Sequence, residues 1–150
     1  MIKTFRGILA DNSEDIIRLS TKKGKIGYQI KKFQLMSRDA GEGAHEMEST
    51  VKIYKVTQTT IDTKVDFSDG NLLGAGQIGS HASFGAYPQS TIIVFDLEIF
   101  NQDIFITHRN NHSDVAPCNY YLELEVLNLS DNAAVVSTLR DIRLNPQVGA

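Results

Sequence analysis

S-T-I-I-V-F-D-L-E-I-F-N-Q-D-I-F-I-T-H-R, residues Ser90–Arg109, is the window in which β-branched and aromatic side chains are densest in this sequence. Asn101-Gln102-Asp103 divides it, and Asn and Asp favour turns because their side chains bond the local backbone. The run Ile92–Phe95 is apolar on both faces, which is typical of a central strand, whereas Ile104–His108 begins to alternate. The stretch therefore predicts two antiparallel strands on a tight turn, which would form the core hairpin of the fold.

Composition indicates an ordinary globular domain. The 150 residues are 41% hydrophobic and 22% charged, a length and balance that suit one domain with a sizeable core. No apolar run approaches the roughly 18 residues of a membrane-spanning helix, and Met1–Gly7 is not the start of a secretory signal. The single cysteine, Cys118, excludes an internal disulfide framework. We therefore expect a protein that folds in the cytoplasm where it is made and does not enter a membrane.

The charge balance argues against nucleic-acid binding. The formal net charge is −3, whereas non-specific binding to nucleic acid needs a concentrated positive surface. Lysines crowd one segment, at Lys22, Lys23, Lys25, Lys31 and Lys32. Lysines also protect an edge strand from pairing with other chains, and we interpret the cluster as such a solvated edge.

Several further strands follow from alternation and turn chemistry. Strands are predicted at Ile2–Leu9, at Ile16–Ser20 after a turn at residues 11–15, and in the clean alternation of Tyr120–Val126. From Ile26 to Leu35 the apolar positions change phase near Lys31-Lys32, which a β-bulge explains.

The remaining segments are less regular. A strand that begins at Val51 is expected to continue, with a bend, as far as Phe67. Ser37–Ser49 and the glycine-rich Leu72–Pro88 are predicted as loops, the second long enough to suggest a binding role. Residues 131–143 fit a strand or a short helix capped by Ser130, and we favour the strand.

Together these segments give about eight short strands with frequent turns and no alternation with long helices. This pattern predicts one all-β domain over residues 1–150, an antiparallel β-sandwich. Eight strands also suit the two Greek keys of a jelly roll, so we expect a jelly-roll-like fold.

Two motifs suggest chemistry that the context does not support. Gly74-Ala75-Gly76-Gln77-Ile78-Gly79 matches the dinucleotide-binding fingerprint, but the residues up to Pro88 cannot form the helix that must hold the pyrophosphate. His108, His112 and Asp114 are the best metal candidates, yet no third histidine is near, because His45 and His81 fall in other loops. We interpret the first motif as a flexible glycine loop and the second as an exposed polar turn.

Acidic residues and the thiol give no better candidate. Asp62, Asp66 and Asp69 miss the ligand spacing of a calcium loop. Glu123 and Glu125 share a strand face at about 7 Å, a separation that suits glycosidase carboxylates and equally the solvated face of a sheet. Nothing in the neighbouring sequence would activate Cys118. The sequence therefore predicts no catalytic, cofactor-binding or metal-binding residue and no cofactor.

Most of the chain, from Ile2 to about Arg143, resembles a group of small proteins encoded by marine tailed bacteriophages. The segments that carry the resemblance are Val51–Tyr54, Thr57–Asp62, Val65–Asp69, Glu98–His108 and Pro117–Val126. The resemblance is weak over Gly74–Gln89 and Arg38–Glu48. Members of this largely uncharacterised group are usually supposed to be virion structural proteins, and no catalytic motif belongs to the group.

The resemblance implies a phage particle as the setting. The expected function is a non-enzymatic virion subunit, most readily a capsid decoration or cement protein. It would be a homo-oligomer that adheres to other virion proteins through loops such as Arg38–Glu48 and Leu72–Pro88. The alternative is a carbohydrate-binding module on a tail or vertex that recognises the host surface. Without tryptophan, its platform would have to come from Tyr28, Tyr54, Tyr87, Tyr120 and Tyr121.

Overall fold

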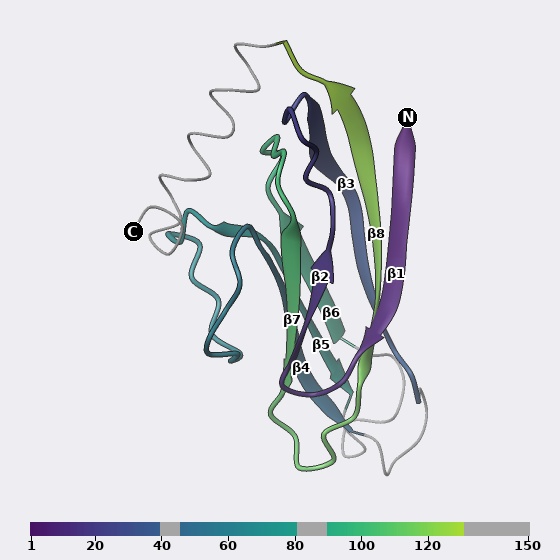
Figure 1. Ribbon diagram of the computed structural model, residues 1–150. Coiled ribbons are helices and arrows are strands. Elements are labelled where there is room, and N and C mark those ends of the chain that lie inside the picture. Colours follow the sequence, from purple (N-terminus) through teal and green to yellow (C-terminus); the bar gives the residue numbers. More distant parts are fainter. Residues whose placement is uncertain (40–45, 81–89, 131–150) are drawn as a thin grey trace.

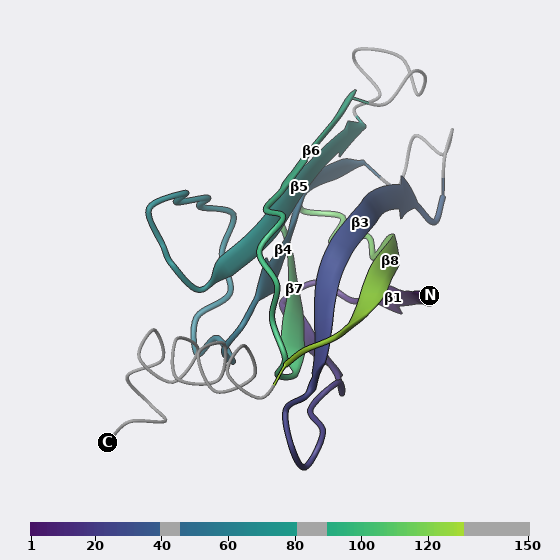
Figure 2. The same cartoon turned by 90° about the horizontal axis from the view of Figure 1, so that it is seen from above.

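The structure, a computed structural model, describes residues 1–39, 46–80 and 90–130. Within these ranges it is all-β, with two antiparallel sheets that face each other (Figures 1 and 2). The smaller sheet has the order β1-β8-β3 and the larger has the order β2-β7-β4-β5-β6. The strands are β1 (Ile2–Leu9), β2 (Ser13–Ile17), β3 (Ile26–Ser37), β4 (Met47–Tyr54), β5 (Leu72–Ser80), β6 (Ser90–Phe95), β7 (Ile104–Asn110) and β8 (Cys118–Asn128). The predicted β-sandwich is confirmed.

The strand order is that of a jelly roll with one departure. β1 pairs with β8, β2 with β7 and β4 with β5, which is the nested pairing of a rolled-up chain. Complete nesting would pair β3 with β6, but β6 pairs with β5. The chain meets β3 only later, where Tyr28 N and Phe100 O lie 2.7 Å apart and Phe100 N and Tyr28 O lie 2.9 Å apart.

The core lies between the two sheets, and period-2 alternation builds it. In β8 the side chains of Tyr120, Leu122 and Leu124 are buried and their neighbours are partly exposed. In β3 the pairing with β8 shifts register between Ile30 and Lys32, so that Ile30 and Phe33 both point into the core. The bulge predicted near Lys31-Lys32 and the strand predicted at Ile2–Leu9 are therefore confirmed.

The predicted core hairpin is wrong. β6 and β7 lie in the same sheet, but β4 and β5 separate them and β6 is the edge strand. The connection between them is no tight turn, because it crosses to the other sheet: Phe100 pairs with Tyr28, and Asn101 Nδ2 donates to Gly24 O. Asp103 then accepts hydrogen bonds from the backbone N–H groups of residues 19 and 20. Long-range contacts, rather than local turn chemistry, decide this connection.

Two strand boundaries also differ from the prediction. The second strand is Ser13–Ile17 and not Ile16–Ser20, because the turn is completed at Asn12, whose φ is 56°. The strand from Val51 ends at Tyr54 instead of continuing to Phe67. From there the chain folds back over the outer face of the larger sheet, where Lys52 Nζ binds Asp62 Oδ1 at 2.9 Å and Lys64 O at 2.6 Å.

Both predicted loops turn out to contain strand residues. Leu72–Ser80 forms β5, in the interior of the larger sheet, and Met47–Ser49 begins β4. Residues 40–45 and 81–89, and the strand-or-helix segment 131–143, lie outside the described residues. Over the described ranges, no helix is long and apolar enough to cross a membrane.

Candidate functional site

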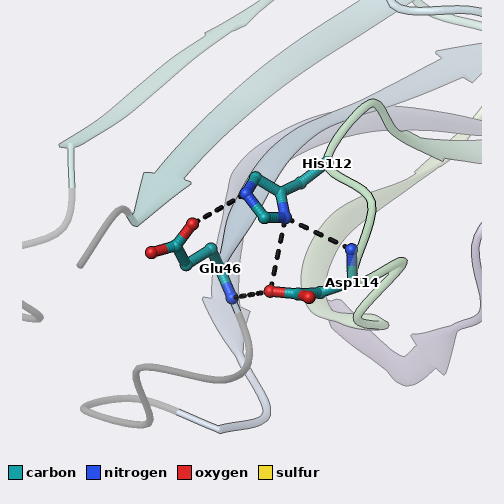
Figure 3. A group of neighbouring side chains, drawn as sticks. All are labelled: Glu46, His112 and Asp114. Carbon is teal, nitrogen blue, oxygen red and sulfur yellow. Dashed lines mark hydrogen bonds and ion pairs between the residues drawn. The ribbon is translucent and has the colours of Figure 1, made fainter. Parts of the chain in front are cut away.

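Glu46, His112 and Asp114 form a cluster where the start of β4 meets the loop after β7 (Figure 3). His112 Nε2 lies 2.7 Å from Glu46 Oε2, and Nδ1 lies 3.3 Å from Asp114 Oδ2. The Asp114 N–H donates to Nδ1 at 3.2 Å, and the Glu46 N–H donates to Asp114 Oδ2 at 3.0 Å. Nε2 thus faces one carboxylate, and Nδ1 lies beside both the N–H and the carboxylate of Asp114.

A buried asparagine holds the loop that presents this cluster. Asn110 is 2% exposed, and its Oδ1 accepts from the N–H groups of His112 and Glu48, while its Nδ2 donates to Ala116 O. Val115 has a φ of 47°, which is unusual for a β-branched residue. The loop is therefore fixed by its own hydrogen bonds, and the cluster fastens it to β4.

The cluster has the donor atoms of a metal site but the spacing of a hydrogen-bonded one. One imidazole and two carboxylates, with ligand atoms within 4.8 Å of one another, are a donor set that divalent cations accept. Two tetrahedral ligands of one zinc ion, each bound at 2.0–2.1 Å, lie about 3.3 Å apart. At 2.7 Å, the His112 and Glu46 atoms are instead at hydrogen-bond distance.

His108 does not join this cluster, and it is not part of an exposed turn. It is fully buried in β7, where Nδ1 lies 2.9 Å from Leu9 O and Nε2 lies 2.9 Å from Ser49 Oγ. Burial lowers the pKa of His108, and hydrogen bonds to the carbonyls of residues 9 and 10 oppose this effect. His108 is thus a neutral imidazole that joins β7 to β4 and to the end of β1.

The other acidic candidates do not form a cluster, because each has its own hydrogen-bond or ion-pair partner. Asp62 binds Lys52, Asp66 accepts from the N–H and hydroxyl of Ser68, and Asp69 accepts from the Asn71 N–H. Glu123 Oε1 accepts from the Tyr121 hydroxyl, and Glu125 Oε1 pairs with the amino group of Met1. The three aspartates therefore shape loop 55–71, and the two glutamates lie on the outer face of the smaller sheet.

The thiol of Cys118 is buried in the core, and burial raises its pKa to about 12. A thiol with this pKa stays protonated at neutral pH.

The glycine motif is explained by packing in β5. A Cβ at Gly76 would lie 2.7 Å from Leu35 Cδ1, and a Cβ at Gly74 would lie 3.1 Å from Phe95 Cβ. Gly76 lets β3 approach the inner face of β5, and Gly74 lets β6 lie close beside it. The motif is inside a strand and not at a strand-to-helix turn, so it lacks the geometry that a dinucleotide needs.

A group of exposed apolar side chains lies on and beside β6. Ile92 is 61% exposed and Val94 is 48% exposed, both on the outer face, while Ile93 and Phe95 pack against the core. Phe67, from the loop over the same sheet, is 70% exposed and lines a hollow of about 160 Å³ together with Val94. We call Phe67, Ile92 and Val94 the β6 surface.

β6 differs from the other three edge strands in its charge. The edge strand β1 carries Lys3 and Arg6, β2 carries Glu14 and Asp15, and β3 carries Lys31 and Lys32 together with a bulge. The sequence of β6, S-T-I-I-V-F, has no charge and no proline, and its pairing with β5 has no register shift. Charges, prolines and bulges are the usual protection of an edge strand, and β6 has none of them.

A groove of about 1020 Å³ crosses the smaller sheet toward β6. Its lining includes Arg6, Gln34, Asn119 and Tyr121, with Thr91 and Ile93 on the β6 side. Of the tyrosines considered for a sugar platform, Tyr28, Tyr54 and Tyr120 are buried, and Tyr87 lies outside the described residues. Tyr120 and Tyr121 both line the groove, and Tyr121 is the one of the two that is only partly buried.

Sequence patterns alone could not have found the whole Glu46–His112–Asp114 cluster or the β6 surface. Glu46 falls in a segment that reads as a loop, and its contact with residues 112–114 depends on the pairing of β4 with β7. The apolar run in β6 reads as a covered central strand, because nothing in its own sequence marks it as an edge. The absence of charge in Ser90–Phe95 is visible in the sequence, but it has meaning only once the edge is known.

No family model matches this chain, and no curated protein matches its sequence. Among solved structures, the crystal structure of the Yersinia pseudotuberculosis-derived mitogen (YPM) is similar, with a TM-score of 0.31 and 16% sequence identity. The match covers 87% of this chain and 87% of that chain.

Proposed function

We propose that this protein is a non-enzymatic structural subunit of a bacteriophage particle, of the capsid decoration or cement type, that acts by adhesion to other virion proteins. The setting rests on the sequence resemblance to phage proteins. The adhesive role rests on one structural observation, the uncharged edge strand β6 with its exposed apolar side chains.

The β6 surface suits adhesion for two physical reasons. Burying exposed apolar side chains is favourable by about 25 cal/mol for each Å² removed from water. An open strand edge also offers a row of unpaired N–H and C=O groups, to which another backbone can add as a further strand. Ile92 and Val94 provide the apolar side chains. The side of β6 that faces away from β5 provides the open edge, since none of the strands in the described ranges pairs with it.

Binding to particles tests this role. Particles made without the gene would be mixed with the purified chain and recovered by sedimentation. Wild type should bind, and Ile92→Lys should bind at least tenfold more weakly because it places a charge in the contact. Ile16→Lys is the matched control, because Ile16 is 46% exposed on the opposite edge strand β2. Equal binding by both variants would exclude β6 as the adhesive surface.

The groove favours a second candidate function, glycan recognition on a tail or vertex. Tyr121 provides an aromatic ring, and Arg6, Gln34 and Asn119 provide groups that could bond sugar hydroxyls. A glycan array probed with wild type and Tyr121→Ala tests it. Signals that disappear with Tyr121→Ala would support this function, and an array without signals would count against it.

A further inference from the structure

The pairing with β5 decides which backbone N–H and C=O groups of β6 point away from the sheet. Asp96 N donates to Leu73 O at 2.8 Å, one residue beyond the pair Gly74 and Phe95 with which the β5–β6 register begins. In an antiparallel pair, residues with hydrogen bonds to the neighbour alternate with residues whose groups point away. Val94 and Ile92 therefore bond to β5, and the N–H and C=O groups of Thr91, Ile93 and Phe95 point away from β5, on the side where none of the described strands pairs with β6.

This spacing is self-complementary. Two antiparallel copies of β6 with Ile93 opposite Ile93 place Thr91 opposite Phe95, so all the outward groups of the three residues find partners. A shift of the register by two residues would leave one outward residue of each copy unpaired. The symmetric arrangement also has the two-fold axis of the commonest kind of homo-oligomer.

The side chains fit the same arrangement. With Ile93 on the two-fold axis, Ile92 of each copy stands opposite Val94 of the other, which gives two equivalent Ile92–Val94 pairs. These are non-hydrogen-bonded pairs, in which the Cα atoms are about 4.5 Å apart and apolar side chains touch. No charged residue of β6 opposes the contact.

We infer that β6 pairs with β6 of a second copy, with Ile93 on the two-fold axis, and joins the two larger sheets into one continuous sheet. This inference rests on the proposed function only in that it uses the same adhesive surface, and it names a second copy as the partner. A six-residue edge contact is smaller than the roughly 1,200–2,000 Å² of a standard interface. Association is therefore expected at micromolar rather than nanomolar concentration.

Disulfide trapping tests both the partner and the register. Ile92→Cys and Val94→Cys change exposed side chains, and the native Cys118 is buried with a pKa raised to about 12, so it does not compete. In a mixture of the two variants, positions 92 and 94 face each other within the 4.4–6.8 Å Cα separation that a disulfide accepts. In either variant alone the two cysteines are diagonal neighbours, about 7–8 Å apart.

Under mild oxidation at about 100 μM, the mixture should give at least fivefold more disulfide-linked dimer than either variant alone. Equal yields would overturn the register. Sedimentation of wild type should show a monomer–dimer equilibrium that Ile92→Lys abolishes and Ile16→Lys preserves. A wild-type chain that stays monomeric at this concentration would overturn self-pairing. If that monomer still binds particles through β6, the proposed adhesion stands with a different partner.

Discussion

Gly76 is the position at which the packing of the two sheets can be tested most sharply. An alanine Cβ at Gly76 would lie 2.7 Å from Leu35 Cδ1, 3.3 Å from Leu35 Cγ and 3.5 Å from Phe33 Cε2. Carbon atoms in contact normally lie about 3.5–4.0 Å apart. Leu35 and Phe33 are themselves buried, so relief of the clash requires movement inside the core. Overpacking of this kind costs about 1–3 kcal/mol.

The same strand contains a matched control. A Cβ at Gly79 would have Met47 O at 3.9 Å as its nearest neighbour, which is an ordinary contact. Replacing glycine by alanine without strain stabilises a protein by about 0.4–1 kcal/mol, because the unfolded chain loses conformational freedom. Gly76→Ala gains the same stabilisation from the less flexible unfolded chain, but the clash with Leu35 costs more, so we expect a net destabilisation of about 1–2 kcal/mol.

Urea unfolding of both variants, with equal m-values, measures the difference. Gly76→Ala should unfold at lower urea than wild type, and Gly79→Ala at equal or higher urea. In the Leu35→Ala background the clash is absent, so Gly76→Ala should there be neutral or stabilising. A Gly76→Ala protein as stable as Gly79→Ala would refute this account of the glycine motif.

Three further predictions concern buried polar groups. Burial lowers the pKa of His108 below 6.5, so its neutral form stabilises the fold above about pH 6.5 and this contribution is lost as pH falls. His108→Gln should therefore flatten the fall of the urea midpoint below that pH, and an unchanged slope would contradict this. Asp62→Ala leaves the Lys52 ammonium, whose side chain is 4% exposed, with only the Lys64 carbonyl and the face of the Tyr54 ring, and should cost about 1–3 kcal/mol. Lys52→Met should cost less in the same urea assay, because no buried charge remains; the reverse order would be inconsistent. Cys118 should react with a thiol reagent only as fast as the chain unfolds, and rapid labelling in native buffer would disprove its burial.

The sequence predicted those strands in which the alternation of apolar and polar residues alone shows which side chains are buried. The alternation of Tyr120–Val126 reports a half-buried strand directly, since the side-chain period of a strand is two. The phase change near Lys31-Lys32 could be assigned to a bulge because the core face must continue on both sides of it. The number of short strands, the frequent turns between them and the lack of long helical patterns predicted the β-sandwich.

Pairing between distant segments could not be predicted. Ser90–Phe95 and Ile104–Asn110 are adjacent apolar strands in the sequence, but Phe100 and Asn101 bond to residues near β3 and direct the chain across the sandwich. β5 reads as a loop because its glycines lack side chains, and their value appears only when Leu35 is placed against Gly76. The same reasoning applies to Glu46, which reaches His112 only through the pairing of β4 with β7.

If the chain is a subunit of a phage particle, as we propose, its abundance in purified particles decides between the possible roles. Quantitative mass spectrometry of purified particles would give its copy number relative to the major shell protein. A decoration or cement role predicts a ratio near one, the value expected for a subunit that covers the whole lattice. A ratio of a few per cent would move the protein to the tail, neck or vertices, and complete absence from the particles would contradict the proposal.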